Sequence, residues 1–377
     1  MAGLTESLGL PPWQPPTPRE VPERRSRLRR YMTSRENLEA LTAAVNAGRT
    51  GVLPVVEAMD PHLSGAAAAS LLAQAEANRL GAAALYYATG DMTSLALAVA
   101  STPPTEVVRR SRLPADAGFM VFAEPIGGYT DVLDHAPAGP TGPIEMPTPI
   151  VAVSWSTWTP GDLTVDGAPV RWANQHDYGE FWWVPQEMRG VWLTFYAAPG
   201  AAYSALPADT VVATDQWGSA TITAGQVATE PRIGPLTWDN ESVLGFDWPF
   251  GDPQPDTTTE WAQVVYTAWQ LMSQVGQPLT EIEELHRDRH GHKRDTRAGI
   301  TGPSDVRIVH VHAAHRPSKQ AADQDAAAST GRRAPQWSCR WPVRPYRRNT
   351  CLNPHAHAAG DCEHEDRIVP AHIKGPA

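Results

Sequence analysis

The sequence has no hydrophobic run long enough to cross a membrane, and it has few cysteines. None of its segments reaches the roughly 18 consecutive apolar residues typical of a transmembrane helix, so no membrane partner is predicted. The first residues lack the basic region and apolar core of a secretory signal. The three cysteines are an odd number, which favours reduced thiols over a disulfide framework. The sequence therefore predicts a cytoplasmic protein.

Common catalytic and phosphate-binding motifs are also missing. The 377 residues contain no P-loop, no H-E-x-x-H zinc-protease motif, no G-x-S-x-G nucleophile elbow and no G-x-G-x-x-G dinucleotide fingerprint. These absences leave the catalytic residues unknown and the question of enzymatic activity open.

The charge is distributed unevenly along the chain. The net charge is −10, but from His286 to the C-terminus 16 lysines and arginines stand against 9 acids, a net charge of +7. Residues 1–285 carry 15 basic and 32 acidic side chains, a net charge of −17. Ten of the 13 histidines also lie in the basic part. A basic, histidine-rich C-terminal part favours a polyanion as its binding partner. The alternative interpretation is a solubilising tail that contacts the acidic body.

Apolar periodicity and turn residues predict an α+β fold: an N-terminal helical bundle, a central mostly antiparallel Trp-rich sheet, one long helix and basic C-terminal strands. Thr257 and Glu260 have the spacing of a capping box and begin the clearest helix. The expected segments, in chain order, are an irregular Pro- and Arg-rich segment 1–33, a helical region 34–103, a β-rich region 104–256, a helix 257–284, a strand with flanking linkers 285–336, and a basic β-hairpin 337–377.

Tryptophans gather in the β-rich region. An aromatic set of this kind forms either a base-stacking platform or a hydrophobic core. A core is favoured, because each indole buries a large apolar area. The tryptophans considered are Trp155, Trp158, Trp182, Trp183, Trp192, Trp238 and Trp248.

Several stretches carry a family resemblance, which covers most of residues 80–377. They are "ALYYATGDMTSLAL", "LPADAGFMVFAEPI", "IVAVSWS", "TAWQLMSQ", "DVRIVHVH" and "RWPVRPYRR…IVPAHIKGP". In this order they resemble a family of uncharacterised proteins from high-GC Gram-positive bacteria and their phages. The resemblance implies a mobile-element or phage-related context and no particular activity. The tail pattern of that family consists of Arg, Trp and Lys-Gly-Pro without a fixed Cys/His set, so the resemblance implies no metal site.

A cluster of cysteines and histidines near the C-terminus is a candidate zinc site. It has the pattern C-x3-H-x-H-x4-C-x-H, and zinc in structural sites prefers four nitrogen or sulfur ligands. The paired C-x2-C signature is missing, so a polar loop between two strands is the alternative. The candidate ligands of a structural zinc ion are Cys351, His355, His357, Cys362 and His364.

The two strands that flank this cluster indicate a basic surface. In "WSCRWPVRPYRR" arginines alternate with apolar residues, which places them on one face of a strand. If this strand pairs with "RIVPAHIKG" as a hairpin, a shared face presents arginine forks suited to phosphate. The alternative is a solvated face whose arginines pair with acids of the body. The candidate nucleic-acid-binding residues are Arg340, Arg344, Arg348, His372 and Lys374.

Three functions follow from these patterns. The favoured one is a mobile-element or phage-related protein that binds DNA or RNA through the basic C-terminal strands. The second is a metal-independent ribonuclease or toxin-like nuclease, in which His312, His315 and His372 with Arg344 supply the acid, base and phosphate contacts. The third is a protein–protein adaptor that binds a partner through the Trp-rich sheet.

Overall fold

The structure is a computed structural model, and it describes most of the chain. The described residues are 13–56, 65–132, 144–162, 164–165, 168–175, 181–214, 221–229, 236–250, 257–274, 279–312, 341–343, 345–352, 364–369 and 372–374.

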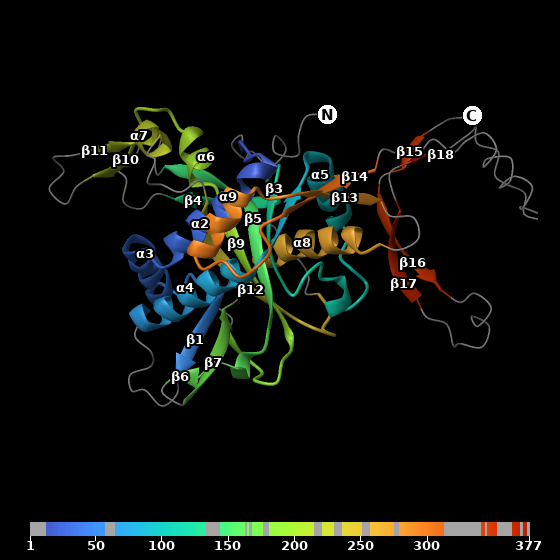
Figure 1. Cartoon of the computed structure of the whole chain (residues 1–377), viewed down its shortest axis with the longest axis horizontal. Coiled ribbons are helices and arrows are strands. Elements are labelled where there is room, and N and C mark those ends of the chain that lie inside the picture. The colour runs from blue at the N-terminus through green and yellow to red at the C-terminus, as the bar shows by residue number, and fades with distance from the viewer. Residues whose placement is uncertain are drawn as a thin grey trace, which may run out of the picture.

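A mixed β-sheet forms the centre of the protein (Figure 1). β2 pairs in parallel with both of its neighbours, β3 and β14, and the other strand pairs of the sheet are antiparallel. This arrangement confirms the α+β class. The strands, in spatial order, are β12 (Thr237–Gly245), β9 (Gly190–Ala197), β5 (Glu145–Trp158), β3 (Ala117–Phe122), β2 (Ala84–Ala88), β14 (Val306–Val311) and β13 (Thr280–Leu285), and β4 (Gly127–Val132) also pairs with β5.

Helices cover both faces of this sheet. Alternate side chains of β2 pack against different helices on the two faces. Leu85 and Tyr87 pack in a core with α2 (Val21–Met32) and α4 (Gly65–Ala82). Tyr86 points to the other face and packs in a second core with α5 (Gly90–Ala100) and α8 (Thr258–Met272). Because both faces are covered, β2 is apolar and buried along its whole length.

The remaining elements are smaller and surround the sheet. β1 (Val52–Val56), β7 (Ala168–Gln175), β8 (Phe181–Val184) and β6 (Thr164–Val165) form a separate antiparallel group. β10 (Val211–Thr214) and β11 (Thr221–Thr223) form a ribbon beside α6 (Pro199–Ser204) and α7 (Ala224–Thr229). The other helices are η1 (Pro18–Glu20), α3 (Arg35–Asn46), η2 (Arg110–Arg112), η3 (Pro160–Asp162) and α9 (Arg289–Arg297).

The long helix is confirmed. α8 begins after Thr257, whose hydroxyl accepts a hydrogen bond from the backbone N–H of Glu260 at 3.4 Å, as the capping box requires. The helix ends at Met272, earlier than the predicted boundary of 284, and β13 follows it. Within the described residues, no helix combines the length and the apolar character needed to cross a membrane.

Several segments differ from the sequence-based prediction. Residues 52–56, within the region expected to be helical, form β1. Residues 84–88, expected to be helical, form β2, because a short apolar run fits a buried strand as well as a helix. The segment 1–33, expected to be irregular, contains α2. Residues 280–297, expected to be the end of a helix and a linker, form β13 and α9, because β13 finds a partner strand in β14.

Most of the tryptophans in the β-rich region belong to the core, as predicted. Trp155 lies at 0% exposure between Tyr86 and Trp269, with ring centroids 5.5 Å and 5.1 Å away. Two tryptophans depart from this pattern. Trp183 is 39% exposed and Trp248 is 40% exposed.

A buried carboxyl group in β12 makes stability depend on pH. Burial raises the pKa of Glu241 from its ordinary 4.5 to about 8, although Trp238 Nε1 donates a hydrogen bond to it at 2.8 Å. Between these two values the folded protein holds a proton that the unfolded chain has released. The contribution of Glu241 to the free energy of unfolding is therefore largest below about pH 4.5, falls as the pH rises from about 4.5 to 8, and changes no further above that.

The variant Glu241→Gln tests this dependence, because the amide keeps the shape of the neutral carboxyl group and cannot ionise. We expect the melting temperature of the parent protein to fall relative to that of the variant between pH 5 and pH 8, roughly the window set by the two pKa values. Thermal melts of both proteins across this range measure the difference. Parallel curves would show that Glu241 does not hold a proton in the folded state.

Candidate functional site

The C-terminal strands pair as the predicted hairpin, in two successive pieces at the edge of the molecule (Figure 1). β15 (Trp341–Val343) pairs with β18 (His372–Lys374), and β16 (Tyr346–Cys351) pairs with β17 (His364–Val369). Both pairs are antiparallel and share one register, since Trp341 lies opposite Lys374 and Tyr346 lies opposite Val369.

Arg347 fixes the hairpin to the body of the protein. Its guanidinium donates hydrogen bonds to Gln270 Oε1, to Thr267 Oγ1 at 2.6 Å and to the carbonyl oxygen of Thr102 at 3.3 Å. Two of these partners lie on α8, on the side that faces β16. Burial lowers the pKa of Arg347, and the charges of Asp366 and Glu106 partly offset this effect. Arg347 is therefore an anchoring residue, which leaves its charge little access to a ligand.

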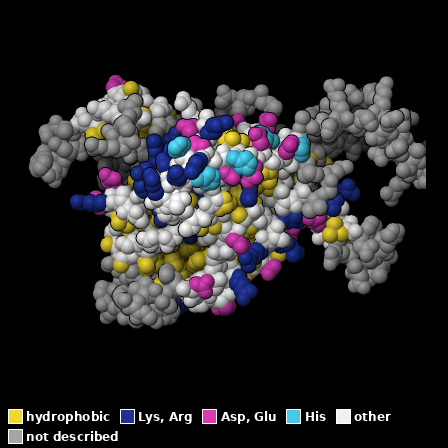
Figure 2. All heavy atoms as spheres, viewed as in Figure 1, with side chains coloured by type: hydrophobic (Ala, Val, Ile, Leu, Met, Phe, Trp, Pro, Cys, Tyr) yellow, Lys and Arg dark blue, Asp and Glu magenta, His cyan; other side chains and the backbone are white. Residues whose placement is uncertain are grey.

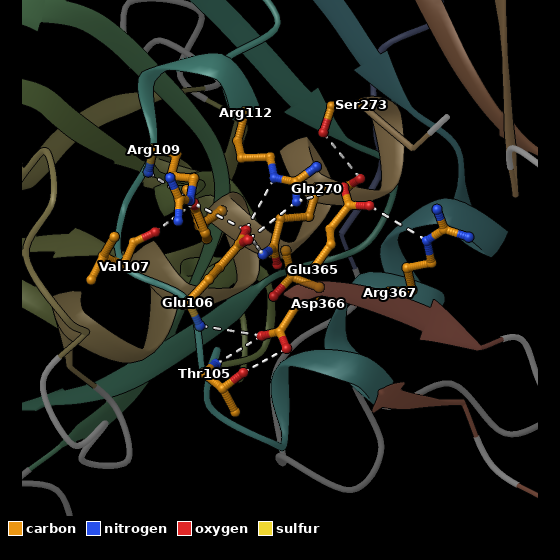
Figure 3. Close-up of polar contacts among 12 residues, drawn as sticks. Thr105, Glu106, Val107, Arg109, Arg112, Gln270, Ser273, Glu365, Asp366 and Arg367 are labelled. Carbon is orange, nitrogen blue, oxygen red and sulfur yellow. Dashed lines mark hydrogen bonds and ion pairs between the residues drawn. The ribbon is translucent and has the colours of Figure 1, made fainter. Parts of the chain in front are cut away.

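Acidic residues of β17 make a second connection, to the segment 105–112 (Figure 3). Asp366 is 8% exposed, and its carboxylate accepts hydrogen bonds from the backbone N–H groups of Thr105 and Glu106 at 2.9 Å and 3.2 Å. Glu365 accepts a hydrogen bond from Arg112 at 3.0 Å. The same Arg112 holds Glu106 through its Nε atom at 3.0 Å. These contacts join the hairpin to the body as one packed unit, and Ile368 adds to the core beside α8.

The opposite face of the hairpin is exposed and carries two arginines. Arg348 and Arg367 lie directly opposite each other in the β16–β17 pair, and both are exposed. We call the surface formed by Tyr346, Arg348 and Arg367 the outer face. Arg367 lies 3.4 Å from Glu365, which Arg112 also contacts, and no described carboxylate lies within ion-pair distance of Arg348.

The structure describes the other predicted phosphate-binding residues only partly. His372 lies opposite Val343 and Lys374 lies opposite Trp341 in the β15–β18 pair, while the side chains of both residues lie outside the description. Arg340 and Arg344 lie outside the described residues. Arg348 is thus the one member of this set whose side chain the structure describes.

Two of the predicted zinc ligands are neighbours. Cys351 and His364 form the last cross-strand pair of β16 and β17, and such pairs have Cβ atoms roughly 5 Å apart. His355, His357 and Cys362 lie outside the described residues. Among the side chains that are described, no group of three or more potential ligands is arranged to hold a metal ion. The zinc site stays a prediction.

Part of the basic, histidine-rich region contacts acids of the body. Figure 2 shows basic and histidine side chains gathered over α9 and the adjoining strands, with acidic side chains among them. His310 of β14 pairs with Glu283 of β13, and His312, which directly follows β14, pairs with Glu281, at 3.3 Å each. His312 belongs to the predicted ribonuclease set, and the side chain of His372, another member, lies outside the description. His315 and Arg344 of that set lie outside the described residues.

Sequence reasoning missed the anchoring residues. Arg347 and Asp366 each lie among several other charged residues in the sequence, and residue type alone does not distinguish them from these neighbours. The period-two pattern of a strand separates Arg347 from Arg348, because neighbouring residues point to opposite faces. That signal shows that two faces exist, but only the position of α8 decides which face is buried.

The comparisons with known proteins add no assignment to this geometry. The chain matches no model of a protein family, no curated protein and no solved structure.

Proposed function

We propose that this protein binds nucleic acid through the outer face of its C-terminal hairpin. The observation that carries the proposal is the cross-strand pair of exposed arginines, Arg348 and Arg367. Like charges directly opposite each other destabilise a strand pair, and a phosphate bound between them removes that repulsion. Arginine forks also bind phosphate through two parallel hydrogen bonds.

The way the hairpin is held supports the same proposal. Arg347, Asp366 and Ile368 anchor the inner face, so that the outer face is presented on a supported element. His372 and Lys374 lie on β18 of the same hairpin, and Arg340 and Arg344 flank β15 in the sequence, so these four predicted residues add to the positive charge expected there.

Binding of labelled single-stranded RNA and DNA tests the proposal, measured by fluorescence anisotropy over a series of salt concentrations. For single strands, three to five phosphate contacts predict a slope of log affinity against log salt of roughly −2 to −3.5. We expect Arg348→Ala and Arg367→Ala each to weaken binding to all sequences alike and to flatten the slope by about one, because phosphate contacts carry no base information.

Arg35→Ala is the matched control. Arg35 is a highly exposed arginine on α3, paired with Glu39 at 2.7 Å, and its removal should leave binding unchanged. A parent protein that does not bind, or two hairpin variants that bind like the parent, would refute the proposal and favour the adaptor alternative. Cleavage of the labelled RNA by the parent would instead favour the ribonuclease alternative.

A further inference from the structure

A large cleft lies away from the hairpin, at the ends of several strands of the central and smaller sheets. Its volume is about 1200 Å³, at the upper end of the range of roughly 300–1000 Å³ typical of small-molecule sites. Four tryptophans and four arginines line it, together with three carboxylates. They are Trp158, Trp172, Trp192, Trp248, Arg79, Arg109, Arg110, Arg189, Asp162, Glu187 and Asp247.

Three of the tryptophans form a rigid aromatic wall. The rings of Trp158, Trp172 and Trp192 contact one another edge to face, with centroids 5.1–5.4 Å apart. The indole N–H groups of Trp172 and Trp192 donate inside the protein, to Pro160 O and to Thr194 Oγ1. Their polar atoms are thus satisfied within the protein. Trp172 and Trp192 are only 2% and 3% exposed, so the half-buried Trp158 is the ring of this wall that faces the cleft.

The rim of the cleft is held together by backbone hydrogen bonds. The N–H of Val108 donates to Trp248 O at 2.9 Å, and the N–H of Asp247 donates back to Val108 O at 2.8 Å. The N–H of Phe246 donates to Arg189 O at 2.8 Å. Asp247 has a φ of 64°, a left-handed conformation that aspartate adopts more readily than most residues. Arg109, Arg189 and Trp248 therefore stand on three segments that are fixed to one another.

The charges in the cleft indicate a ligand with a single anionic group. Arg110 pairs with Asp116, and the buried Arg79 pairs with Glu76. Arg109 and Arg189 are exposed, and neither lies within ion-pair distance of a described carboxylate. Asp162, Glu187 and Asp247 outnumber these two arginines, so the cleft lacks the excess of positive charge that a long polyanion needs, and the two arginines suit a compact ligand with one anionic group.

We propose that the cleft binds a nucleoside phosphate. Trp158 and Trp248, the two lining tryptophans with exposed ring surface, provide stacking surfaces for a base, which all bases accept because each has a π-face. Arg109 and Arg189 provide donors for the phosphate, and the carboxylates accept hydrogen bonds from sugar hydroxyls and base amino groups. This inference is independent of the hairpin, since none of the residues that line the cleft belongs to it.

Quenching of tryptophan fluorescence and isothermal titration calorimetry with the full chain test the inference. The probes are AMP, GMP, CMP and UMP, with adenosine, ribose 5-phosphate and inorganic phosphate as partial ligands. We expect at least one nucleotide to bind saturably, and to bind more tightly than its nucleoside or ribose 5-phosphate. Failure of all four nucleotides to bind at millimolar concentration would overturn the inference. Ribose 5-phosphate or phosphate binding as tightly as the nucleotides would also overturn it.

Variants of the rim assign the binding to this cleft. Arg109→Gln and Arg189→Gln should each weaken nucleotide binding roughly tenfold or more and leave nucleoside binding unchanged, because only the phosphate contact is lost. Trp248→Ala should weaken both ligands by about fivefold to a hundredfold through lost stacking. Trp183→Ala and Arg35→Gln are the controls, because Trp183 is as exposed as Trp248 and neither control residue lines the cleft. Nucleotide binding that survives all three rim variants unchanged would place the site elsewhere and refute the assignment.

Discussion

Replacing Glu76 by alanine should destabilise the protein by about 3–5 kcal/mol, the cost typical of removing one partner of a buried ion pair. Glu76 is 3% exposed on α4 and pairs with Arg79, which is also buried. Its carboxylate also accepts hydrogen bonds from Ser154 Oγ at 2.6 Å, from Thr194 Oγ1 at 2.8 Å and from the hydroxyl of Tyr196. The variant leaves a buried guanidinium without a counter-charge and three hydroxyl groups without their acceptor.

Urea denaturation followed by circular dichroism measures this loss. Glu39→Ala is the control, since Glu39 forms an exposed pair within one helix and should contribute no more than about 0.5 kcal/mol. Arg79→Ala should cost less in the Glu76→Ala background than in the parent, because the second change removes the uncompensated charge. A loss below about 1 kcal/mol for Glu76→Ala, or strictly additive changes, would show that the pair is not coupled.

Arg347→Ala should release the hairpin from the body, whereas the neighbouring Arg348→Ala should leave it in place. The first change removes donors to Gln270, Thr267 and Thr102, and hydrogen bonds of a charged group contribute roughly 1.5–3 kcal/mol each when a partner is lost. The second removes an exposed side chain, which should alter stability by no more than about 0.5 kcal/mol.

Limited trypsin proteolysis and amide hydrogen exchange distinguish the two variants. In Arg347→Ala we expect faster exchange along β16 and β17 and new cleavage at Arg367, while the core strands exchange as in the parent. Asp366→Asn should have a smaller effect in the same direction, because the amide keeps one acceptor for the backbone N–H groups of Thr105 and Glu106. Equal protection of the hairpin in Arg347→Ala and Arg348→Ala would contradict the anchoring role.

The two arginine variants also separate stability from binding. Arg348→Ala is expected to keep the fold and lose nucleic-acid affinity. Arg347→Ala is expected to lose the docked hairpin and, with it, the supported outer face. Adjacent residues of one type thus serve as controls for each other, since the strand directs their side chains to opposite sides.

The local sequence pattern was sufficient to predict those helices and strands whose signals lie within a few residues. The capping box at Thr257 and the apolar stripe that follows it predicted α8, and the alternation around Arg348 predicted a paired strand. The same kind of reasoning failed for β2, because five apolar residues carry no period that distinguishes a buried strand from a helix. It also failed for α2, whose many arginines resemble a solvated segment.

Contacts between distant parts of the chain decided the rest. Arg25 lies at 0% exposure in α2 because its guanidinium donates to Ala83 O and Pro303 O, 58 and 278 residues away. The cleft likewise combines Arg109, Arg189 and Trp248, which no spacing rule connects. The amino-acid sequence by itself determined the α+β class, the long helix, the C-terminal hairpin and the uneven distribution of charge, because each of these depends on periodicity or composition. The tertiary structure alone decided which charged side chains are buried and which are exposed, because burial of a charge requires partners that folding brings from elsewhere in the chain.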